Sequence, residues 1–392
     1  MRRVAITGIG AISAAGNNLS ETLDAFWHER SNLGSVSLFS TTLTYPVFEI
    51  KGVDVGKYDK GMRTLNLALR AVREAIDDAE LQNDLQEFKV GVCLGTTVAS
   101  QLNDLEFYRA YRSGKNVSIN SVDRFLKGNL SEAVGRKIKA SGPFATVVNA
   151  CSSGTDAIGV ALSWLRNGLC DIAIAGGADE LNLIPFCGFA SLGVLSDSLC
   201  APFDRDRKGL NLGEGAGILV LEAEPVARQR GRNSDLFLCG YGLASDAYHL
   251  TAPHPEGVGL EAALRRALSE ADIAPGDVCF VNAHGTATQD NDKIEGKVLN
   301  RVFGPDLTFL STKGFTGHTL GAAGGLEAAF TAAALRKKWI PASIGFKNQD
   351  STISIAPIMK KTTLSGNFAV STSLAFGGNN SALVIEKRGH HT

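Results

Sequence analysis

The feature that most constrains the fold is a set of three short segments that recur, in the same order, in the two halves of the chain. Each segment reads as an apolar strand that runs into a glycine-containing turn. The pairs are "VAITGIGAISAA" at 4–15 with "LFLCGYGLASDA" at 236–247, "VCLGTTV" at 92–98 with "VNAHGTA" at 281–287, and "VVNACSSG" at 147–154 with "TFLSTKGFTGH" at 308–318. An ordered set of repeats is typical of a duplicated architecture.

The expected strands are short and almost wholly apolar, as in "DIAIAGGA" and "FAVSTSLAF". Such strands are typical of α/β units that are covered by helices. We therefore predict an α/β fold built from two similar halves, residues 1–235 and 236–392, the first of which carries insertions. The segment "GTDAIGVALSWLRNGLCD" is apolar on nearly every face, so we expect it to form a helix buried between the halves.

The composition excludes several classes of protein. A formal net charge of −1 gives no support for a nucleic-acid or anionic-membrane partner, and no apolar run reaches the roughly 18 residues of a spanning helix. The seven cysteines are odd in number, scattered, and form no CxxC pair. This pattern argues against a disulfide framework or a zinc site and favours a reducing cytoplasm.

Four residues stand where chemistry is expected. Cys151 ends one strand and begins the apolar helix, where the helix dipole and free N–H groups would lower the pKa of a thiol. The alternative is a buried structural cysteine. His284 and His318 each follow a repeated strand, the place where α/β folds bind ligands, although either could be structural. Lys313 lies in the turn before His318 and is read either as a surface charge or as a buried partner.

The glycine clusters predict packing rather than phosphate binding. "TGIGAIS" lacks the last glycine of a dinucleotide fingerprint, and no Walker lysine follows. "GEGAG" and "GAAGG" are interpreted as sites where helices and strands approach closely.

Five motifs together resemble the elongating β-ketoacyl-[acyl carrier protein] synthases of the thiolase superfamily, and they occur in that family's order. They are "NACSSG", "APFDRDRKGLNLGEGAG", "NAHGTAT", "STKGFTGHTLGAAGG" and "SLAFGGNNSALV". The resemblance covers essentially the whole chain. It implies a thiolase-like fold of five αβαβα layers, in a homodimer or a heterodimer.

The resemblance also implies roles for individual residues. Cys151 would be the nucleophile that accepts the acyl group. His284 and His318 would promote malonyl decarboxylation and stabilise the resulting enolate. Lys313 would anchor the hydrogen bonds around the second histidine, and Glu327 would support it.

Three further residues complete the implied site. Thr286 and Thr288 would contact the phosphopantetheine arm. Phe376 would be a gate, and its backbone N–H would form an oxyanion hole with that of Cys151. The implied chemistry needs no metal and no organic cofactor. The implied partners are an acyl carrier protein and, in a heterodimer, a ketosynthase-like or chain-length-factor subunit.

The chain departs from the family pattern at three places. Gly314 replaces the usual serine after the active-site lysine, Leu374 replaces a phenylalanine, and "TATQDND" replaces a Pro-Leu-Gly-Asp continuation. The motif combination resembles the synthases of aryl-polyene or flexirubin-type pigment pathways more than housekeeping fatty-acid enzymes.

Two other functions stay open at this point. One is a non-catalytic subunit of the chain-length-factor kind, against which the intact Cys151 argues. The other is a Cys/His thioesterase or acyltransferase. Basic residues of the first half could dock an acidic carrier or could be ordinary solvated charges; they are Arg63, Arg112, Lys115, Arg124 and Lys127.

Overall fold

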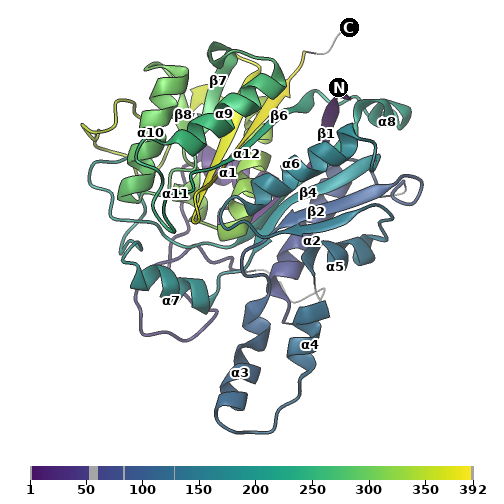
Figure 1. Ribbon diagram of the computed structural model, residues 1–392, viewed down its shortest axis with the longest axis vertical. Coiled ribbons are helices and arrows are strands. Elements are labelled where there is room, and N and C mark those ends of the chain that lie inside the picture. The colour runs from purple at the N-terminus through teal and green to yellow at the C-terminus, as the bar shows by residue number, and fades with distance from the viewer. Residues whose placement is uncertain (1, 53–60, 83, 128, 390–392) are drawn as a thin grey trace.

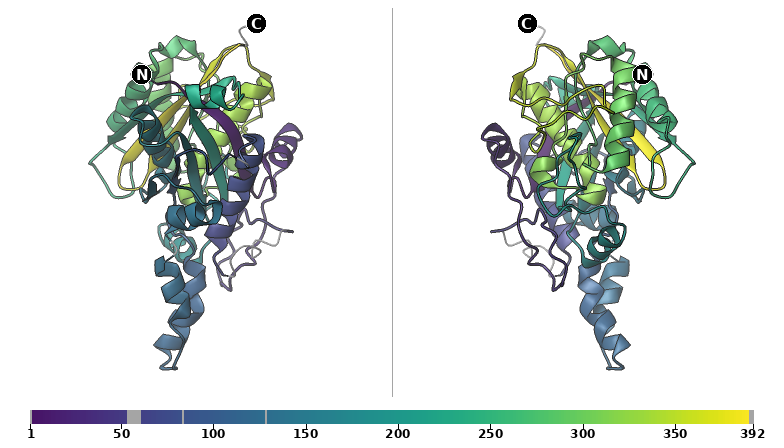
Figure 2. Two further views of the ribbon diagram at one scale, coloured as in Figure 1. Left: turned by 90° about the vertical axis from the view of Figure 1, so that its right-hand side faces the viewer. Right: turned by 90° about the vertical axis from the view of Figure 1, so that its left-hand side faces the viewer.

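The computed structural model describes residues 2–52, 61–82, 84–127 and 129–389, which form a layered α/β body with one projecting helical hairpin (Figures 1 and 2). No helix within these ranges is both long and apolar enough to cross a membrane. All seven cysteines are free thiols.

Ten strands form one mixed sheet in the order β3-β2-β4-β5-β1-β6-β12-β11-β7-β8, and β9 and β10 pair separately. The strands are β1 (Val4–Ser13), β2 (Val90–Gly95), β3 (Phe144–Val147), β4 (Ile172–Asp179), β5 (Gly215–Ala223), β6 (Leu236–Ser245), β7 (Val278–Asn282), β8 (Phe309–Leu310), β9 (Trp339–Ile340), β10 (Thr362–Thr363), β11 (Phe368–Ala375) and β12 (Asn379–Lys387).

The sheet has two arms with the same strand order. Outward from the β1/β6 junction, the first arm runs β1-β5-β4-β2-β3 and the second runs β6-β12-β11-β7-β8. In each arm the two outermost pairs are parallel and the inner pairs are antiparallel. The three repeated segments thus begin at or overlap strands in equivalent positions: β1 and β6, β2 and β7, β3 and β8. The division of the chain at 235/236 stays a prediction.

Helices cover both arms and fill the space between them. The helices are α1 (Leu19–Trp27), α2 (Arg63–Asp78), α3 (Leu105–Arg112), α4 (Asn120–Lys127), α5 (Leu130–Ile138), α6 (Ser153–Arg166), α7 (Leu183–Ser191), α8 (Glu224–Gln229), α9 (Val258–Ala271), α10 (Gln289–Phe303), α11 (Lys313–Thr316) and α12 (Ala323–Lys337), with short 3-10 turns η1 (Gln101–Asp104), η2 (Pro275–Asp277) and η3 (Leu320–Ala322).

The layers follow from which helix packs on which strand. Helix α2 packs on β1 and β5 and α5 packs on β2 and β3, whereas α9 covers β6 and β12 with α10 beside it. Helices α6 and α12 contact strands of both arms. The predicted α/β fold with an αβαβα layering is therefore confirmed.

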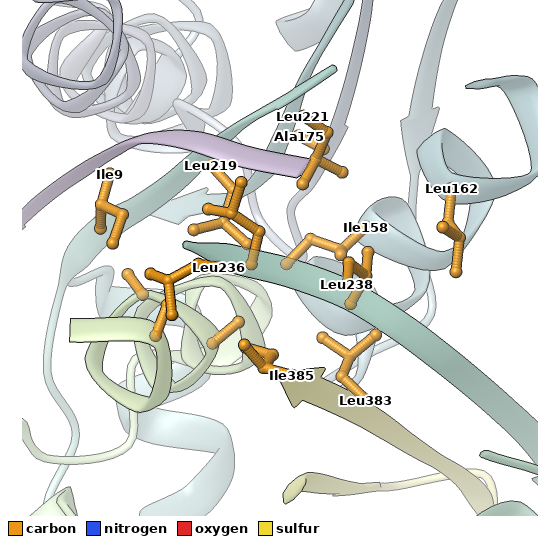
Figure 3. Packing of buried hydrophobic residues seen from close by; sticks show 14 of the residues in the cluster. Ile9, Ile158, Leu162, Ala175, Leu219, Leu221, Leu236, Leu238, Leu383 and Ile385 are labelled. Carbon is orange, nitrogen blue, oxygen red and sulfur yellow. The ribbon is translucent and has the colours of Figure 1, made fainter. Parts of the chain in front are cut away.

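The central helix α6 lies in the largest apolar cluster, at the seam between the arms (Figure 3). Its Ile158 and Leu162 share this cluster with Leu219 of β5, Leu238 of β6 and Leu383 of β12. A helix enclosed by two arms must be apolar on most faces, because no broad face meets water. The predicted position of this helix is confirmed.

Glycines let the central helices approach each other and the sheet. A Cβ on Gly154 of α6 would lie 2.7 Å from the backbone N of Gly325 and 2.9 Å from the carbonyl O of Gly321. A Cβ on Gly217 of β5 would lie 2.3 Å from the backbone N of Leu326. The interpretation of "GEGAG" and "GAAGG" as packing motifs is therefore confirmed.

We expect Gly154→Ala to lower the free energy of unfolding by about 1–3 kcal/mol, because the new methyl group meets backbone atoms that cannot move aside. Urea denaturation measures the loss. The matched control is Gly188→Ala in α7, where a Cβ meets nothing within 4 Å, and this variant should be unchanged or about 0.5–1 kcal/mol more stable. A Gly154→Ala variant as stable as the parent would show that the helices can separate at no cost.

Candidate active site

Cys151 lies in a sharp turn between β3 and α6. The preceding residue, Ala150, has a φ of +49°, a left-handed conformation that costs about 1 kcal/mol for a side chain with a Cβ. Ser153 holds this turn, since its Oγ donates to the carbonyl of Ala150 at 2.6 Å and accepts from the N–H of Asn149 at 2.8 Å. The turn places Cys151 on the wall of a cavity of about 270 Å³.

His318 reaches the same cavity from the second arm. Its N–H donates to the carbonyl of Asn211 at 2.8 Å, and its own carbonyl accepts from the N–H of Gly213 at 3.0 Å. The preceding Gly317 has a φ of +66°, and a Cβ there would lie 2.7 Å from the ring of Phe48. The side-chain Nε2 of His318 lies 3.1 Å from Sγ of Cys151. This distance allows proton transfer between the thiol and the imidazole.

His284 stands two residues beyond β7, with its ring centroid 5.2 Å from that of His318 and nearly perpendicular to it. Its backbone N–H donates to Glu295 Oε1 at 2.8 Å and to Thr372 Oγ1 at 3.1 Å. Nζ of Lys313 donates to its Nδ1 at 3.2 Å. Because Nδ1 is an acceptor, the ring proton of the neutral imidazole resides on Nε2, which is then a donor.

The sequence analysis expected Lys313 to hydrogen bond around His318, but in the structure its partner is His284. Lys313 hydrogen bonds both Nδ1 and the carbonyl of His284 and forms a buried ion pair with Glu327. Burial raises the pKa of Glu327 to about 7, although the positive charge of Lys313 opposes the shift. Glu327 therefore supports the lysine, and the lysine in turn fixes the first histidine.

The electrostatics of the site favour neutral groups. Burial, together with the charge of Lys313, lowers the pKa of both His284 and His318 well below the ordinary value. Burial raises the pKa of Cys151 to about 11, and this outweighs the opposing effects of the Phe376 N–H and Lys313. The predicted lowering of the thiol pKa by the helix terminus is therefore wrong. The resting pair is a thiol and a neutral imidazole.

We expect alkylation of Cys151 by iodoacetamide to accelerate about tenfold per pH unit from about pH 7 to about pH 10 without a plateau, because the thiolate is the reactive form. Mass spectrometry of the Cys151 peptide measures the rate. The peptide of the exposed Cys187 is quantified in the same digest as a separate signal. A plateau near neutral pH would contradict the neutral resting pair.

The rest of the cavity wall mixes apolar and polar side chains. Thr286 and Thr288 line it, with their hydroxyl oxygens 2.9 Å apart. Phe376 stacks on Phe189 of α7 at a centroid distance of 5.5 Å, and Phe189 also meets the ring of His318 edge-on. The sequence analysis missed Phe189, because a phenylalanine in an apolar helix carries no signal of proximity to a site.

A buried carboxylate joins the nucleophile turn to the second arm. Asp156 of α6 accepts hydrogen bonds from Ser152 Oγ at 2.8 Å, Tyr241 OH at 2.9 Å and the hydroxyl of Ser381. The sequence analysis missed this residue. The signal was present, since Asp156 is the one acidic residue in an otherwise apolar helix.

A second missed carboxylate, Asp179, ends β4 and links two loops of the site. It accepts from Thr96 Oγ1 at 2.6 Å, from the N–H of Val98 at 3.1 Å and from the N–H of Gly321, three residues after His318, at 2.7 Å. Burial raises the pKa of Asp179 to about 6. Its place at a strand end was the signal that could have found it.

Two predictions about single positions can be examined directly. The serine-to-glycine departure at Gly314 has a steric reason, because a Cβ there would lie 2.5 Å from the carbonyl O of Ile344. The prediction that Arg63 could dock an acidic carrier is wrong. Its guanidinium pairs with the buried Glu214 through Nε at 2.7 Å and Nη2 at 2.5 Å, and 17% of its side chain is exposed.

The other four candidate cations lie on or beside the projecting hairpin of α3 and α4, and all are exposed; they are Arg112, Lys115, Arg124 and Lys127. Lys127 pairs with Asp123 at 2.8 Å. In the part of the chain that the structure describes, no group of three or more His, Cys, Asp or Glu side chains is arranged to hold a metal ion.

Family models match both halves of the chain. Residues 1–227 match the model described as "Beta-ketoacyl synthase, N-terminal domain", and residues 237–347 match "Beta-ketoacyl synthase, C-terminal domain".

Curated relatives and solved structures match along almost the whole chain. The 3-oxoacyl-[acyl-carrier-protein] synthase 2 of Staphylococcus aureus (strain N315) is 34% identical over 98% of both chains. The ishigamide ketosynthase/chain length factor superposes with a TM-score of 0.93 at 31% identity, covering 99% of this chain and 100% of that one. The complex AntDE:AntF, a type II polyketide synthase carrier protein with its ketosynthase bound to the hexaketide, gives a TM-score of 0.90 at 26% identity, again over 99% and 100%.

Proposed function

The chain belongs to the β-ketoacyl synthase family, and we propose on that premise that it condenses a carrier-bound acyl group with a carrier-bound malonyl group, with loss of CO₂. The observation that carries the proposal is the 3.1 Å contact between Sγ of Cys151 and Nε2 of a neutral His318, in a cavity that His284 also lines. This arrangement supplies a nucleophile, its base and a second hydrogen-bond donor at one place.

In the first half-reaction, Sγ of Cys151 attacks the thioester carbonyl of the acyl carrier. His318 Nε2 takes the thiol proton as the S–C bond forms, and the carrier thiol leaves with a proton. The oxyanion formed in this step is bound by the backbone N–H groups of Cys151 and Phe376. The N–H of Phe376 lies close enough to Sγ to oppose the rise in the pKa of the thiol.

In the second half-reaction, a malonyl thioester replaces the first carrier. Its C–C bond to the carboxylate breaks, CO₂ leaves, and the electron pair becomes an enolate. Nε2–H of His284 donates to the enolate oxygen, and His318 also donates to it once its ring proton has moved to Nε2. The enolate carbon then attacks the Cys151 thioester. The bond from Sγ to the acyl carbon breaks, Cys151 leaves as a thiolate that takes up a proton, and the product remains on the second carrier, two carbons longer. No step requires a metal or an organic cofactor.

The carrier's arm enters along the wall that Thr286 and Thr288 form, and Phe376 gates the acyl end of the cavity. The acyl carrier protein is thus the proposed substrate partner, as in AntDE:AntF. The pigment-type pathway and the cytoplasmic location stay predictions.

The proposed structural partner is a second ketosynthase-like subunit, either another copy of this chain or a chain-length factor, as in the ishigamide complex. The hairpin of α3 and α4 projects from the body and has no fully buried residue (Figure 2). It exposes Tyr111 and Leu126, which are 66% and 74% accessible, and Val148 beyond the edge strand β3 is 67% accessible. Apolar surface of this kind is typical of subunit contacts.

Intact-mass spectrometry tests the function. The protein is incubated with a panel of acyl carriers, first alone and then with malonyl carrier. We expect an acyl adduct on Cys151 that is consumed only when malonyl carrier is added, with release of CO₂ and a β-ketoacyl product. Release of free acid without malonate would instead indicate a thioesterase. The absence of any adduct would indicate a non-catalytic subunit.

A further inference from the structure

One buried guanidinium outside the catalytic group holds a wall of the cavity. The side chain of Arg207 is 1% exposed and comes from the loop between α7 and β5. Its Nε donates to the carbonyl of Thr288 at 3.3 Å and its Nη2 to the carbonyl of Gln289 at 3.0 Å. Its Nη1 donates to the carbonyl of Asp204 at 2.8 Å and pairs with Asp350 at 2.6 Å. Arg207 therefore links the carbonyls of Thr288 and Gln289 in the cavity wall to the carboxylate of Asp350.

The wall needs such support because its backbone is strained. Ala287, between the two threonines, has a φ of +66°, which costs about 1–2 kcal/mol for a residue with a Cβ. Asp292 holds one side of this turn by accepting from the N–H groups of Thr286 and Ala287 at 3.0–3.2 Å. Those bonds restrain the N–H side. Arg207 restrains the carbonyl side, at the point where the turn enters α10.

The contact is reciprocal. Nε2 of Gln289 donates back to the carbonyl of Arg207 at 2.7 Å. Gln289 stands in "TATQDND", and its side-chain amide supplies the donor of this bond. Three hydrogen bonds therefore join Arg207 to Thr288 and Gln289, and in one of them the wall is the donor.

A neighbouring arginine of the same loop shows the contrast. Arg205 is exposed and pairs with the equally exposed Asp206 at 3.0 Å. A pair of this kind contributes little to stability. The pair of Arg207 is different: hydrogen bonds from Arg207 and from Thr352 lower the pKa of Asp350 to about 2, so Asp350 stays charged at neutral pH.

We infer that Arg207 is a positioning residue that sets the enzyme's affinity for the pantetheine arm. It touches neither the thiol nor the two histidines. It acts by fixing the backbone of Thr288 and Gln289 in the conformation that binds the pantetheine arm. The inference depends on the proposed function, because it takes the arm as the ligand of this wall.

The test compares Arg207→Lys with the matched control Arg205→Lys in the full chain. Lysine keeps the charge but cannot make the fork of contacts to several oxygens. For Arg207→Lys we expect KM for acyl-pantetheine to rise about tenfold, with kcat changed by less than about threefold. The rate of Cys151 alkylation by iodoacetamide, which needs no arm, should change by less than about twofold. Gln289→Ala should raise KM about threefold, and Arg205→Lys should leave all three quantities unchanged.

Two results would overturn the inference. One is an unchanged KM in both Arg207→Lys and Gln289→Ala. The other is an equal loss of alkylation and of acyl-pantetheine use, which would place the effect on the nucleophile or on the fold. Failure of the proposed function has a separate signature, since the parent enzyme itself would then form no acyl adduct from acyl-pantetheine.

Discussion

Replacement of Cys151 by alanine is expected to abolish acyl loading and to lower the condensation rate by roughly 10⁴-fold or more, because the reaction loses its covalent intermediate. The variant should fold, since alanine at this site keeps the Cβ and removes only the sulfur. Intact-mass spectrometry with an acyl carrier measures loading, and product formation with malonyl carrier measures condensation.

The matched control is Cys187→Ala, which removes the exposed thiol of α7 and should load and condense normally. In Cys151→Ala both histidines remain, so decarboxylation of malonyl carrier should persist without condensation. An undiminished amount of acyl adduct in Cys151→Ala would contradict the proposed mechanism, because the acyl group would then reside on another residue.

Much of the fold could be predicted because the same strand-and-turn segments occur in both halves of the sequence. Each repeated segment carries its own local signal of an apolar strand and a turn, and the matching order in the two halves implies matching positions in the sheet. The largely apolar helix after Cys151 can bury most of its faces only between the two arms. The continuous β1/β6 junction was not foreseeable, since the pairing of Val4 with Leu238 depends on how the arms meet.

The site was partly predictable for the same reason. Cys151, His284 and His318 stand at ends of repeated strands, and the structure brings them together in one cavity. The expected pKa of the Cys151 thiol was wrong because it depends on how deeply the thiol is buried. The helix terminus at Cys151 is a local feature, but the burial that raises the thiol pKa comes from the whole surrounding fold. The preference of Lys313 for His284 likewise depends on side-chain paths that spacing does not reveal.

The second large effect is expected at the buried ion pair. Lys313→Met should lower the free energy of unfolding by about 3–5 kcal/mol above about pH 8, because the buried carboxyl of Glu327 must then either stay charged without a partner or take up a proton. Loss of the lysine raises the pKa of Glu327 further above its present value of about 7. When the pKa of a carboxyl is higher in the folded state than in the unfolded state, the folded state loses stability as the pH rises. The loss begins near the unfolded-state pKa of 4.5 and continues up to the folded-state pKa. The destabilisation should therefore shrink near pH 5, which urea titrations at several pH values will measure.

The double variant Lys313→Met/Glu327→Gln separates stability from chemistry. With both charges removed, most of the lost stability should return, and its pH dependence should disappear. Activity should not return, because nothing then donates to Nδ1 of His284 and its Nε2 proton is no longer fixed; we expect malonyl decarboxylation to stay roughly 10²-fold slower. A double variant as unstable as the single one would show that the pair matters through packing. A fully active double variant would show that Lys313 does not orient His284.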